Sequence, residues 1–168
     1  MTPDPAAVPS SDRARLDSTL HSEAVDFGPM EYQLGFLLRL AQIEDFKAFY
    51  RRFGQLEMRP GEYSALIAIG INPGIRQGVL ASALMIKRSN MAKMIGALAR
   101  RGLVRRRVPA DDKRAVELHP TPKSRALVRK VMPDIIAHDR DASWMLDAGE
   151  REVLIALLRK MIGRPGEP

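Results

Sequence analysis

Apolar residues recur at spacings of three and four along most of this chain, a period typical of amphipathic helices. Two short stretches, 103–108 and 115–119, have the character of β-strands, and a polar loop joins them. The pattern predicts helices over 31–53, 61–70, 76–84, 87–101, 122–140 and 147–162. The predicted fold class is therefore mainly α with a small β-hairpin before the last two helices.

The ends of several predicted helices carry residues suited to those positions. Gly102 follows the helix over 87–101, where a left-handed glycine commonly ends a helix. Thr121 precedes a proline and fits an N-cap, and Asp147 with Glu150 three residues later fits a capping box. These residues support the boundaries that the apolar pattern suggests.

The helix predicted over 31–53 has two adjacent apolar stripes. The first stripe comprises Leu34, Leu37, Leu38 and Ala41, and the second comprises Phe36, Leu40, Ile43, Tyr50 and Phe53. A helix with two such stripes is usually buried on two sides. One side can face its own core and the other a partner subunit, although a simple core helix explains the pattern equally well.

The first 29 residues lack apolar periodicity and contain prolines at positions 3, 5, 9 and 29. We therefore expect a flexible N-terminal arm over 1–29, and a short tail over 164–168. No apolar run approaches the ~20 residues that span a bilayer, and the N-terminus lacks the basic and apolar regions of a secretory signal. The prediction is a cytoplasmic protein without a membrane partner.

Positive charge is concentrated in the middle of the chain. Residues 59–120 contain 12 basic and 4 acidic side chains, a balance of +8 in a chain whose net charge is +7. A basic block of this density is typical of proteins that bind a polyanion, most often nucleic acid.

Enzymatic and metal chemistry find little support. The chain has no cysteine, which excludes disulfides, zinc–cysteine sites, iron–sulfur clusters and thiol catalysis. His21, His119 and His138 lie far apart, and no nucleophile-elbow, dinucleotide or phosphate-loop motif is present. Asp111 and Asp112 precede two cations and are better explained as loop residues than as acid–base catalysts. We expect no catalytic site, metal or cofactor.

A short helix over 76–84, a tight turn, a longer helix over 87–101 and a basic hairpin form the outline of a winged helix-turn-helix. One α-helix fits the major groove of DNA, and in this motif its first turns reach the base edges. Donor side chains crowd the first turns of the longer helix: Lys87, Arg88, Ser89, Asn90 and Lys93. The longer helix is therefore the candidate recognition helix.

The hairpin adds a second group of cations. Its basic residues are Arg105, Arg106, Arg107, Lys113 and Arg114. Such a wing can contact phosphates or enter a minor groove, whereas taken alone it could be a solvated charged face. The preceding helix-turn-helix pattern favours DNA binding.

Several motifs occur together in a specific order: RPGEY at 59–63, NPGIRQ at 72–77, LA at 80–81, KRSNM at 87–91, LARRGLV at 98–104, DDKR at 111–114 and LHPT at 118–121. In this order and spacing, residues 31–162 resemble a MarR-type transcriptional regulator. The resemblance implies a homodimer, with dimerisation helices over 30–57 and 121–163 and a winged helix-turn-helix over 58–120. It also implies binding to an inverted repeat in double-stranded DNA, mostly as a repressor that a small effector releases.

The resemblance further assigns roles to residues. It makes Arg114 the wing-tip arginine and Asp112 the carboxylate that fixes it. The family often has Ser or Thr where Arg76 stands, so the scaffold helix lacks its usual cap, although Arg76 suits a phosphate. The predicted DNA-binding residues are Arg76, Gln77, Lys87, Arg88, Ser89, Asn90, Lys93, Arg105, Arg107, Lys113 and Arg114.

Ligands of such regulators bind between the dimerisation helices and the winged domain. The aromatic residues of the first helix resemble those of regulators of aromatic-acid catabolism, which suggests an aromatic acid or aromatic acyl-CoA. Arg39 either binds an anionic ligand group or is a surface charge. The candidate ligand-binding residues are Phe36, Arg39, Leu40, Ile43 and Tyr63.

Two other functions stay open at this point. A ligand-independent, nucleoid-type protein would bind random DNA almost as well as its own promoter. A protein-interaction module would use the two-stripe helix and show no salt-dependent binding to duplex DNA.

Overall fold

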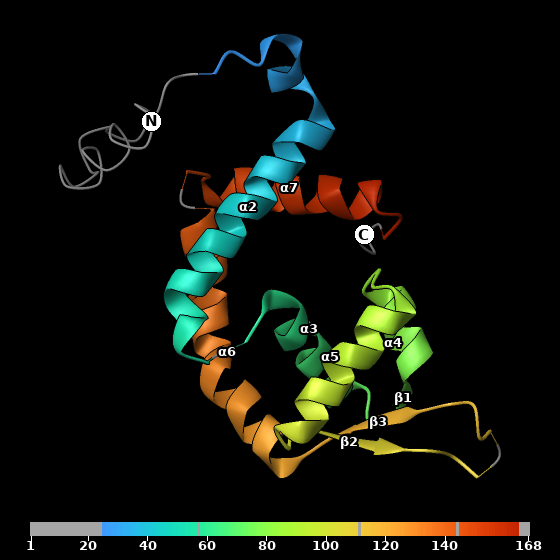
Figure 1. The fold of residues 1–168 in the computed structure, drawn as a ribbon. Helices are drawn as coiled ribbons and strands as arrows, with labels where there is room; N and C mark the ends of the chain where they lie inside the picture. The colour runs from blue at the N-terminus through green and yellow to red at the C-terminus, as the bar shows by residue number, and fades with distance from the viewer. Residues whose placement is uncertain (1–24, 57, 111, 144, 165–168) are drawn as a thin grey trace. The chain divides into compact units, whose positions relative to one another are not determined.

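The computed structural model describes residues 25–56, 58–110, 112–143 and 145–164, and the chain divides into two units, 1–41 and 42–168. Most of the expected arm therefore lies outside the described residues. The first unit contains the 3-10 helix η2 (Gly28–Tyr32) and the start of helix α2 (Leu34–Phe53), whose later turns belong to the second unit (Figure 1). The helix expected from residue 31 begins at Leu34 because Gln33 is extended, with φ −84° and ψ 124°.

The second unit contains a winged helix-turn-helix followed by two further helices. Its elements are η3 (Gly54–Leu56), α3 (Pro60–Ile71), β1 (Ile75–Arg76), α4 (Gln77–Ala83), α5 (Arg88–Arg100), β2 (Val104–Arg107), β3 (Glu117–Pro120), α6 (Pro122–Ala142) and α7 (Ala148–Met161). The mainly helical fold class predicted from the sequence is confirmed, and each predicted helix is present with small shifts at its ends.

The sheet has three antiparallel strands in the order β1-β3-β2, where the sequence predicted two. The additional strand β1 pairs Ile75 with Leu118. The predicted second strand over 115–119 is also shifted, because the ladder of β2 and β3 ends where Arg107 faces Glu117. Pro109 lies just beyond and has no N–H to continue such a ladder.

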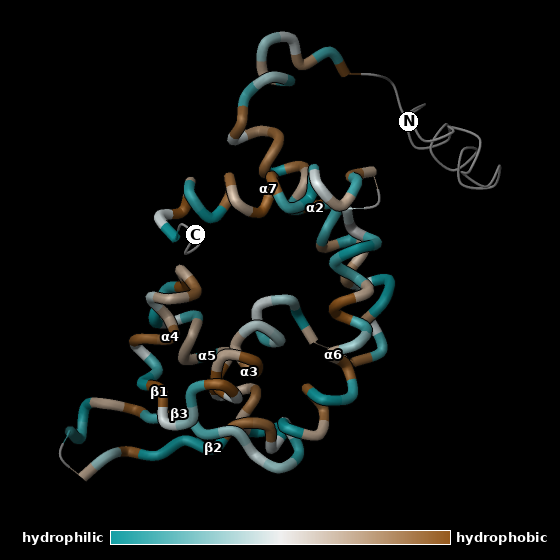
Figure 2. The backbone as a smooth tube through the Cα atoms, turned by 180° about the vertical axis from the view of Figure 1, so that it is seen from behind, coloured by the Kyte–Doolittle hydropathy of each residue, from teal (hydrophilic) through white to brown (hydrophobic). Residues whose placement is uncertain are grey.

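The core of the second unit lies between the helix-turn-helix and the sheet. Its largest fully buried side chains are Ile69, Leu80, Met91, Ile95, Leu98 and Leu118. They come from α3, α4, α5 and β3, so each of these elements is fixed by the same core, and Figure 2 shows hydrophobic colouring on α3 and hydrophilic colouring on β2. Burial of these side chains is the main stabilising contribution to the unit.

Side-chain caps join the winged region to the helices that follow it. Gly102 ends α5 with φ +71°, as predicted, in a conformation that glycine adopts without steric cost. Thr121 caps α6 by accepting from the Ser124 N–H, and its hydroxyl donates to the Gly102 carbonyl at 2.8 Å. Thr121 therefore ties the start of α6 to the end of the α5 helix.

The later turns of α2 are attached to α6. His138, on α6, is buried with its Nε2 atom 3.1 Å from Asp45 Oδ1 and its ring edge-on to Phe49 and Phe53. Arg52 forms an ion pair with Asp134 on the same helix at 3.6 Å. These contacts hold two helices, far apart in sequence, against each other.

Helix α7 is different, because it has no buried residue. Its N-cap is Asp147, which accepts from the Glu150 N–H at 2.9 Å in the predicted capping box. Its exposed apolar residues are Val153, Leu154, Ile155, Leu157 and Met161. Among the described residues, no helix has the length and apolar character needed to cross a membrane.

Candidate nucleic-acid interface

Helix α5 has an exposed polar N-terminal end, and its apolar face is buried in the core. Met91, Ile95 and Leu98 are each 0% exposed and fix the rotation of the helix about its axis. The polar residues of its first turns, namely Arg88, Ser89, Asn90 and Lys93, are all exposed, as is the N-cap residue Lys87. Because the first turn contains no acidic residue, this end offers donors without a competing carboxylate on the helix.

The turn before α5 is tight. Met85 has φ +53°, an uncommon conformation for a residue other than glycine, and its side chain is exposed. The Ile86 N–H donates to the Ala81 carbonyl at 2.9 Å, which closes the turn against α4. This geometry sets the angle at which α5 leaves the scaffold helix α4.

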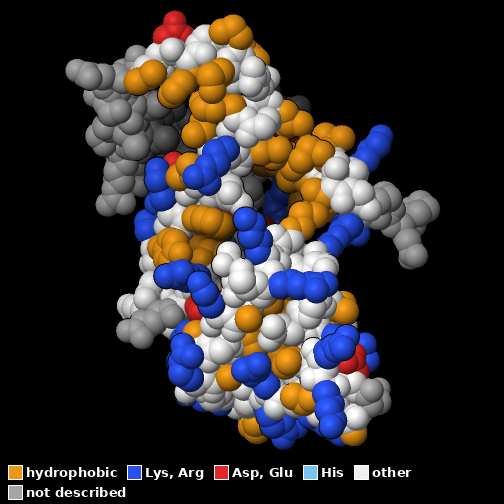
Figure 3. Space-filling view, turned by 45° about the vertical axis from the view of Figure 1, so that its right-hand side comes forward, with side chains coloured by type: hydrophobic (Ala, Val, Ile, Leu, Met, Phe, Trp, Pro, Cys, Tyr) orange, Lys and Arg blue, Asp and Glu red, His pale blue; other side chains and the backbone are white. Residues whose placement is uncertain are grey.

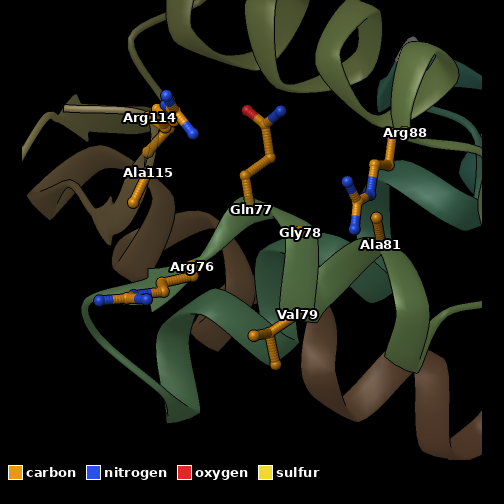
Figure 4. A pocket seen from close by; sticks show the side chains of 9 residues that line it. Arg76, Gln77, Gly78, Val79, Ala81, Arg88, Arg114 and Ala115 are labelled. Carbon is orange, nitrogen blue, oxygen red and sulfur yellow. The ribbon is translucent and has the colours of Figure 1, made fainter. Parts of the chain in front are cut away.

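A cleft of about 370 Å³ lies between α4, the start of α5 and the wing. Figure 4 shows the amide of Gln77 standing between Arg88 and Arg114, whereas Arg76 points away from Arg88. The Gln77 Oε1 atom is buried and accepts no hydrogen bond within the described part of the chain. Two guanidinium groups on either side of one cleft form a site suited to an anionic oxygen group such as a phosphate.

The wing turn is organised by Asp112. Its Oδ1 atom accepts from the Arg114 N–H at 3.0 Å, and its Oδ2 atom lies 3.7 Å from Arg76 Nη1. Asp112 therefore contacts Arg114 through the backbone and connects the wing to the residue that precedes α4. The guanidinium of Arg114 faces the cleft, and neighbouring Lys113 is exposed.

The cations of β2 alternate across the sheet. Arg105 pairs with His119 and Arg107 with Glu117, whereas Arg106 lies opposite the buried Leu118. Since partners in an antiparallel pair share a face, Arg105 and Arg107 lie on one face and Arg106 on the other. The hairpin projects away from the helices, and Figure 3 shows Lys and Arg side chains spread over the surface of the second unit.

A second cleft, of about 680 Å³, lies along α5 on its other side. It brings Asn90 and Lys93 together with Arg59, which the sequence reasoning did not include. Arg59 is exposed, and its backbone N–H donates to Glu62 Oε2 at 3.0 Å. The sequence offered one indication that Arg59 belongs to this surface. The residue lies directly before a proline that begins a helix, and it falls within the basic block over 59–120.

Comparisons with known proteins agree with this geometry. The model of the MarR family matches residues 56–115. Over 141 residues the chain is 35% identical to a putative transcriptional regulatory protein for the hcr operon of Thauera aromatica, covering 83% of this chain and 85% of that protein. The chain belongs to the MarR family. It is a DNA-binding transcriptional regulator with the winged helix-turn-helix fold.

Solved structures of one repressor are similar to this MarR-family chain. CouR bound to a 23-mer DNA duplex superposes with a TM-score of 0.77 at 28% identity, covering 83% of this chain and 99% of that one. CouR bound to p-coumaroyl-CoA superposes with a TM-score of 0.75 at 26% identity, covering 83% and 98%. The family resemblance inferred from the motifs is thus confirmed.

The candidate ligand residues of this MarR-family regulator fall into both units. Phe36, Arg39 and Leu40 belong to the first unit, whereas Ile43 and Tyr63 belong to the second. The Phe36 ring packs against Phe27, with centroids 5.1 Å apart. Tyr63 is buried, which raises the pKa of its hydroxyl above its ordinary value, and this hydroxyl lies 4.0 Å from Met132 Sδ. Their role in ligand binding stays a prediction.

Proposed function

We propose that this regulator is a homodimeric repressor that reads an inverted-repeat operator with α5 and the wing, and that a small organic anion releases it. The observation that carries the proposal is the pairing of an exposed polar helix end with two guanidinium groups across one cleft. Base edges are read by side chains such as Asn90, while arginines such as Arg88 and Arg114 hold phosphates or enter a minor groove.

The proposed homodimer rests on α7. Its apolar residues, among them Leu154, Leu157 and Met161, are exposed, and no residue of the helix is buried. An exposed apolar face of this kind commonly marks a protein interface, and a second copy supplies a matching one. A twofold dimer would place two α5 helices on half-sites about one helical turn, ~34 Å, apart.

Release by a ligand is supported by the structures of CouR, which was solved both with DNA and with p-coumaroyl-CoA. A ligand can shift a regulator away from DNA only if it binds the two conformations with different affinities. Because two recognition helices must match the spacing of the operator, a small change in that spacing is enough to weaken binding.

Fluorescence anisotropy with two labelled duplexes tests the proposal. One duplex is the intergenic DNA upstream of the regulator's own gene, and the other is a scrambled duplex of equal length. We expect tighter, salt-dependent binding to the upstream DNA, reversed by a member of a panel of aromatic acids and their CoA thioesters. Equal affinity for both duplexes would favour a nucleoid-type protein, and the absence of salt-dependent binding would favour a protein-interaction module.

A further inference from the structure

Helix α5 has a cleft along each of its two flanks. The cleft of about 370 Å³ is lined by Arg88 from α5 and by Arg114 from the wing. The cleft of about 680 Å³ is lined by Asn90 and Lys93 from α5 and by Arg59, which precedes α3. Because the apolar face of α5 points into the core, the side between the two clefts faces outward. An arginine from a different element therefore lies beside each flank of the exposed face.

The backbone around Arg59 is held firmly beside α5. The preceding residue, Met58, is 3% exposed and belongs to the core. The Arg59 carbonyl accepts from the Tyr63 N–H at 3.1 Å as α3 begins. A Cβ added at Gly61 would lie 3.4 Å from the Cε atom of Met94, so the first turn of α3 packs closely against α5. The position of Arg59 relative to α5 is thus fixed by the core.

The side chain of Arg59, in contrast, is available for an anion. It is exposed, and within the described part of the chain its guanidinium forms no hydrogen bond or ion pair. Glu62 lines the same cleft, but its Oε2 atom accepts from the Arg59 backbone N–H at 3.0 Å and lies 3.8 Å from Arg101 Nη1. Because Arg101 offsets the charge of this carboxylate, the cleft keeps the positive charge of Arg59 and Lys93.

The shape of DNA gives these two flanks different partners. The major groove is ~12 Å wide, and an α-helix with its side chains is ~10–12 Å across. A helix that fills the groove therefore has one phosphate backbone along each flank. Arg88 and Arg114 lie beside one flank, so a contact with the other backbone has to come from the side of Arg59.

We propose that Arg59 binds a phosphate of this second backbone, across the major groove from the phosphates that Arg88 and Arg114 contact. The inference rests on the proposed insertion of α5 into the groove. A guanidinium suits a phosphate because it donates several hydrogen bonds in a fixed geometry. Such a contact positions the helix without reading sequence, and it lies on the flank that carries Asn90.

Salt titrations of DNA binding test the charge of Arg59. Arg59→Gln should raise the Kd about tenfold on the upstream and on the scrambled duplex alike, and make the slope of log K against log salt shallower by about 1. Arg59→Lys keeps the charge and should keep the slope. If Arg59→Gln has the affinity and the slope of wild type, the proposal is wrong.

A matched variant shows whether the effect belongs to this position. Arg51→Gln removes an exposed arginine of α2 that lines neither cleft beside α5, and it should leave the slope unchanged. Circular dichroism should show the same melting temperature for Arg59→Gln as for wild type, because the side chain it replaces is exposed and makes no contact of its own. An equal change of slope in Arg51→Gln would mean that only net charge matters, and would overturn the assignment.

Neutral methylphosphonates locate the phosphate. Each is placed singly along both strands of the upstream duplex, and wild-type protein should lose affinity where it contacts the replaced phosphate. One of these losses should disappear in Arg59→Gln, and another, on the opposite border of the groove, should disappear in Arg114→Ala. If both variants remove the same loss, or if Arg59→Gln removes none, the proposed contact does not exist.

The same measurements separate this inference from the proposed function. If Asn90→Ala and Arg114→Ala weaken binding but Arg59→Gln does not, the proposed function stands and the contact fails. If Arg59→Gln weakens binding while wild type does not prefer the upstream duplex over the scrambled one, the contact stands and the proposed sequence-specific repressor fails.

Discussion

Helices α5 and α7 have the same spacing of apolar residues in the sequence, yet these residues are buried in α5 and exposed in α7. Helix α5 buries Met91, Ile95 and Leu98 completely within its own protomer. Helix α7 buries none of its residues, and Leu157 is 58% exposed. Helix α5 is therefore fixed in position by its own chain, and its polar end is held in a defined orientation. Helix α7 instead keeps an exposed apolar face, which the proposed dimer covers with a second copy.

The largest expected effect comes from the core of α5. Leu98→Ala removes a fully buried side chain and should lower the free energy of unfolding by about 2–5 kcal/mol. Leu157→Ala, the same change on α7, should instead weaken self-association. Chemical denaturation and sedimentation measure the two quantities. If Leu157→Ala leaves self-association unchanged, α7 is not the dimer face.

The next effect concerns the polar end of α5. Asn90→Ala should weaken binding to the preferred duplex by about 1–3 kcal/mol, the range for a lost base contact, while binding to scrambled DNA changes little. Competition anisotropy with both duplexes gives the two losses. Equal losses on both would make Asn90 a phosphate contact.

A smaller effect, of about tenfold in affinity, is expected for the wing. Arg114→Ala should weaken binding to both duplexes and make the slope of log K against log salt shallower by about 1. Lys160→Ala removes an exposed cation from α7 and is the matched control. An unchanged slope in Arg114→Ala, or an equal change in Lys160→Ala, would contradict the role of the wing.

The smallest effect is a pH dependence at Tyr63. Because burial raises the pKa of its hydroxyl, the folded state favours the neutral phenol. The resulting stability is fully present below the ordinary tyrosine pKa of about 10 and is lost as the pH rises through the raised value. Urea denaturation gives the free energy of unfolding below the ordinary tyrosine pKa and above the raised one. The fall in this free energy between the two pH values should be smaller in Tyr63→Phe than in wild type. Identical losses would show that Tyr63 does not contribute.

Much of the fold could be predicted from the sequence because local residues determine it. Gly102 and Asp147 mark helix ends through their own conformation or hydrogen bonds, and both marks are confirmed. Strand β1 was missed because two residues cannot show an alternating pattern, and Ile75 is a strand residue only through its pairing with Leu118.

The candidate site was only partly predictable for a related reason. The exposed donors of α5 follow from helical periodicity, so Arg88 and Asn90 could be identified without a structure. The approach of Arg76 to Asp112, the cleft between Arg88 and Arg114, and the position of Arg59 beside Asn90 all depend on packing between distant segments. Sequence spacing contains no information about such contacts.

DNA cleavage from a tethered reagent shows directly whether α5 lies against DNA. Because the chain has no cysteine, Ser89→Cys places one thiol, and hence one iron–EDTA group, at the exposed start of α5. Glu152→Cys places the same group on α7 as a control. From position 89 we expect two cleavage clusters that lie about one helical turn, ~34 Å, apart, and from position 152 we expect none. Absence of cleavage from position 89, or equal cleavage from position 152, would contradict the contact of α5 with DNA.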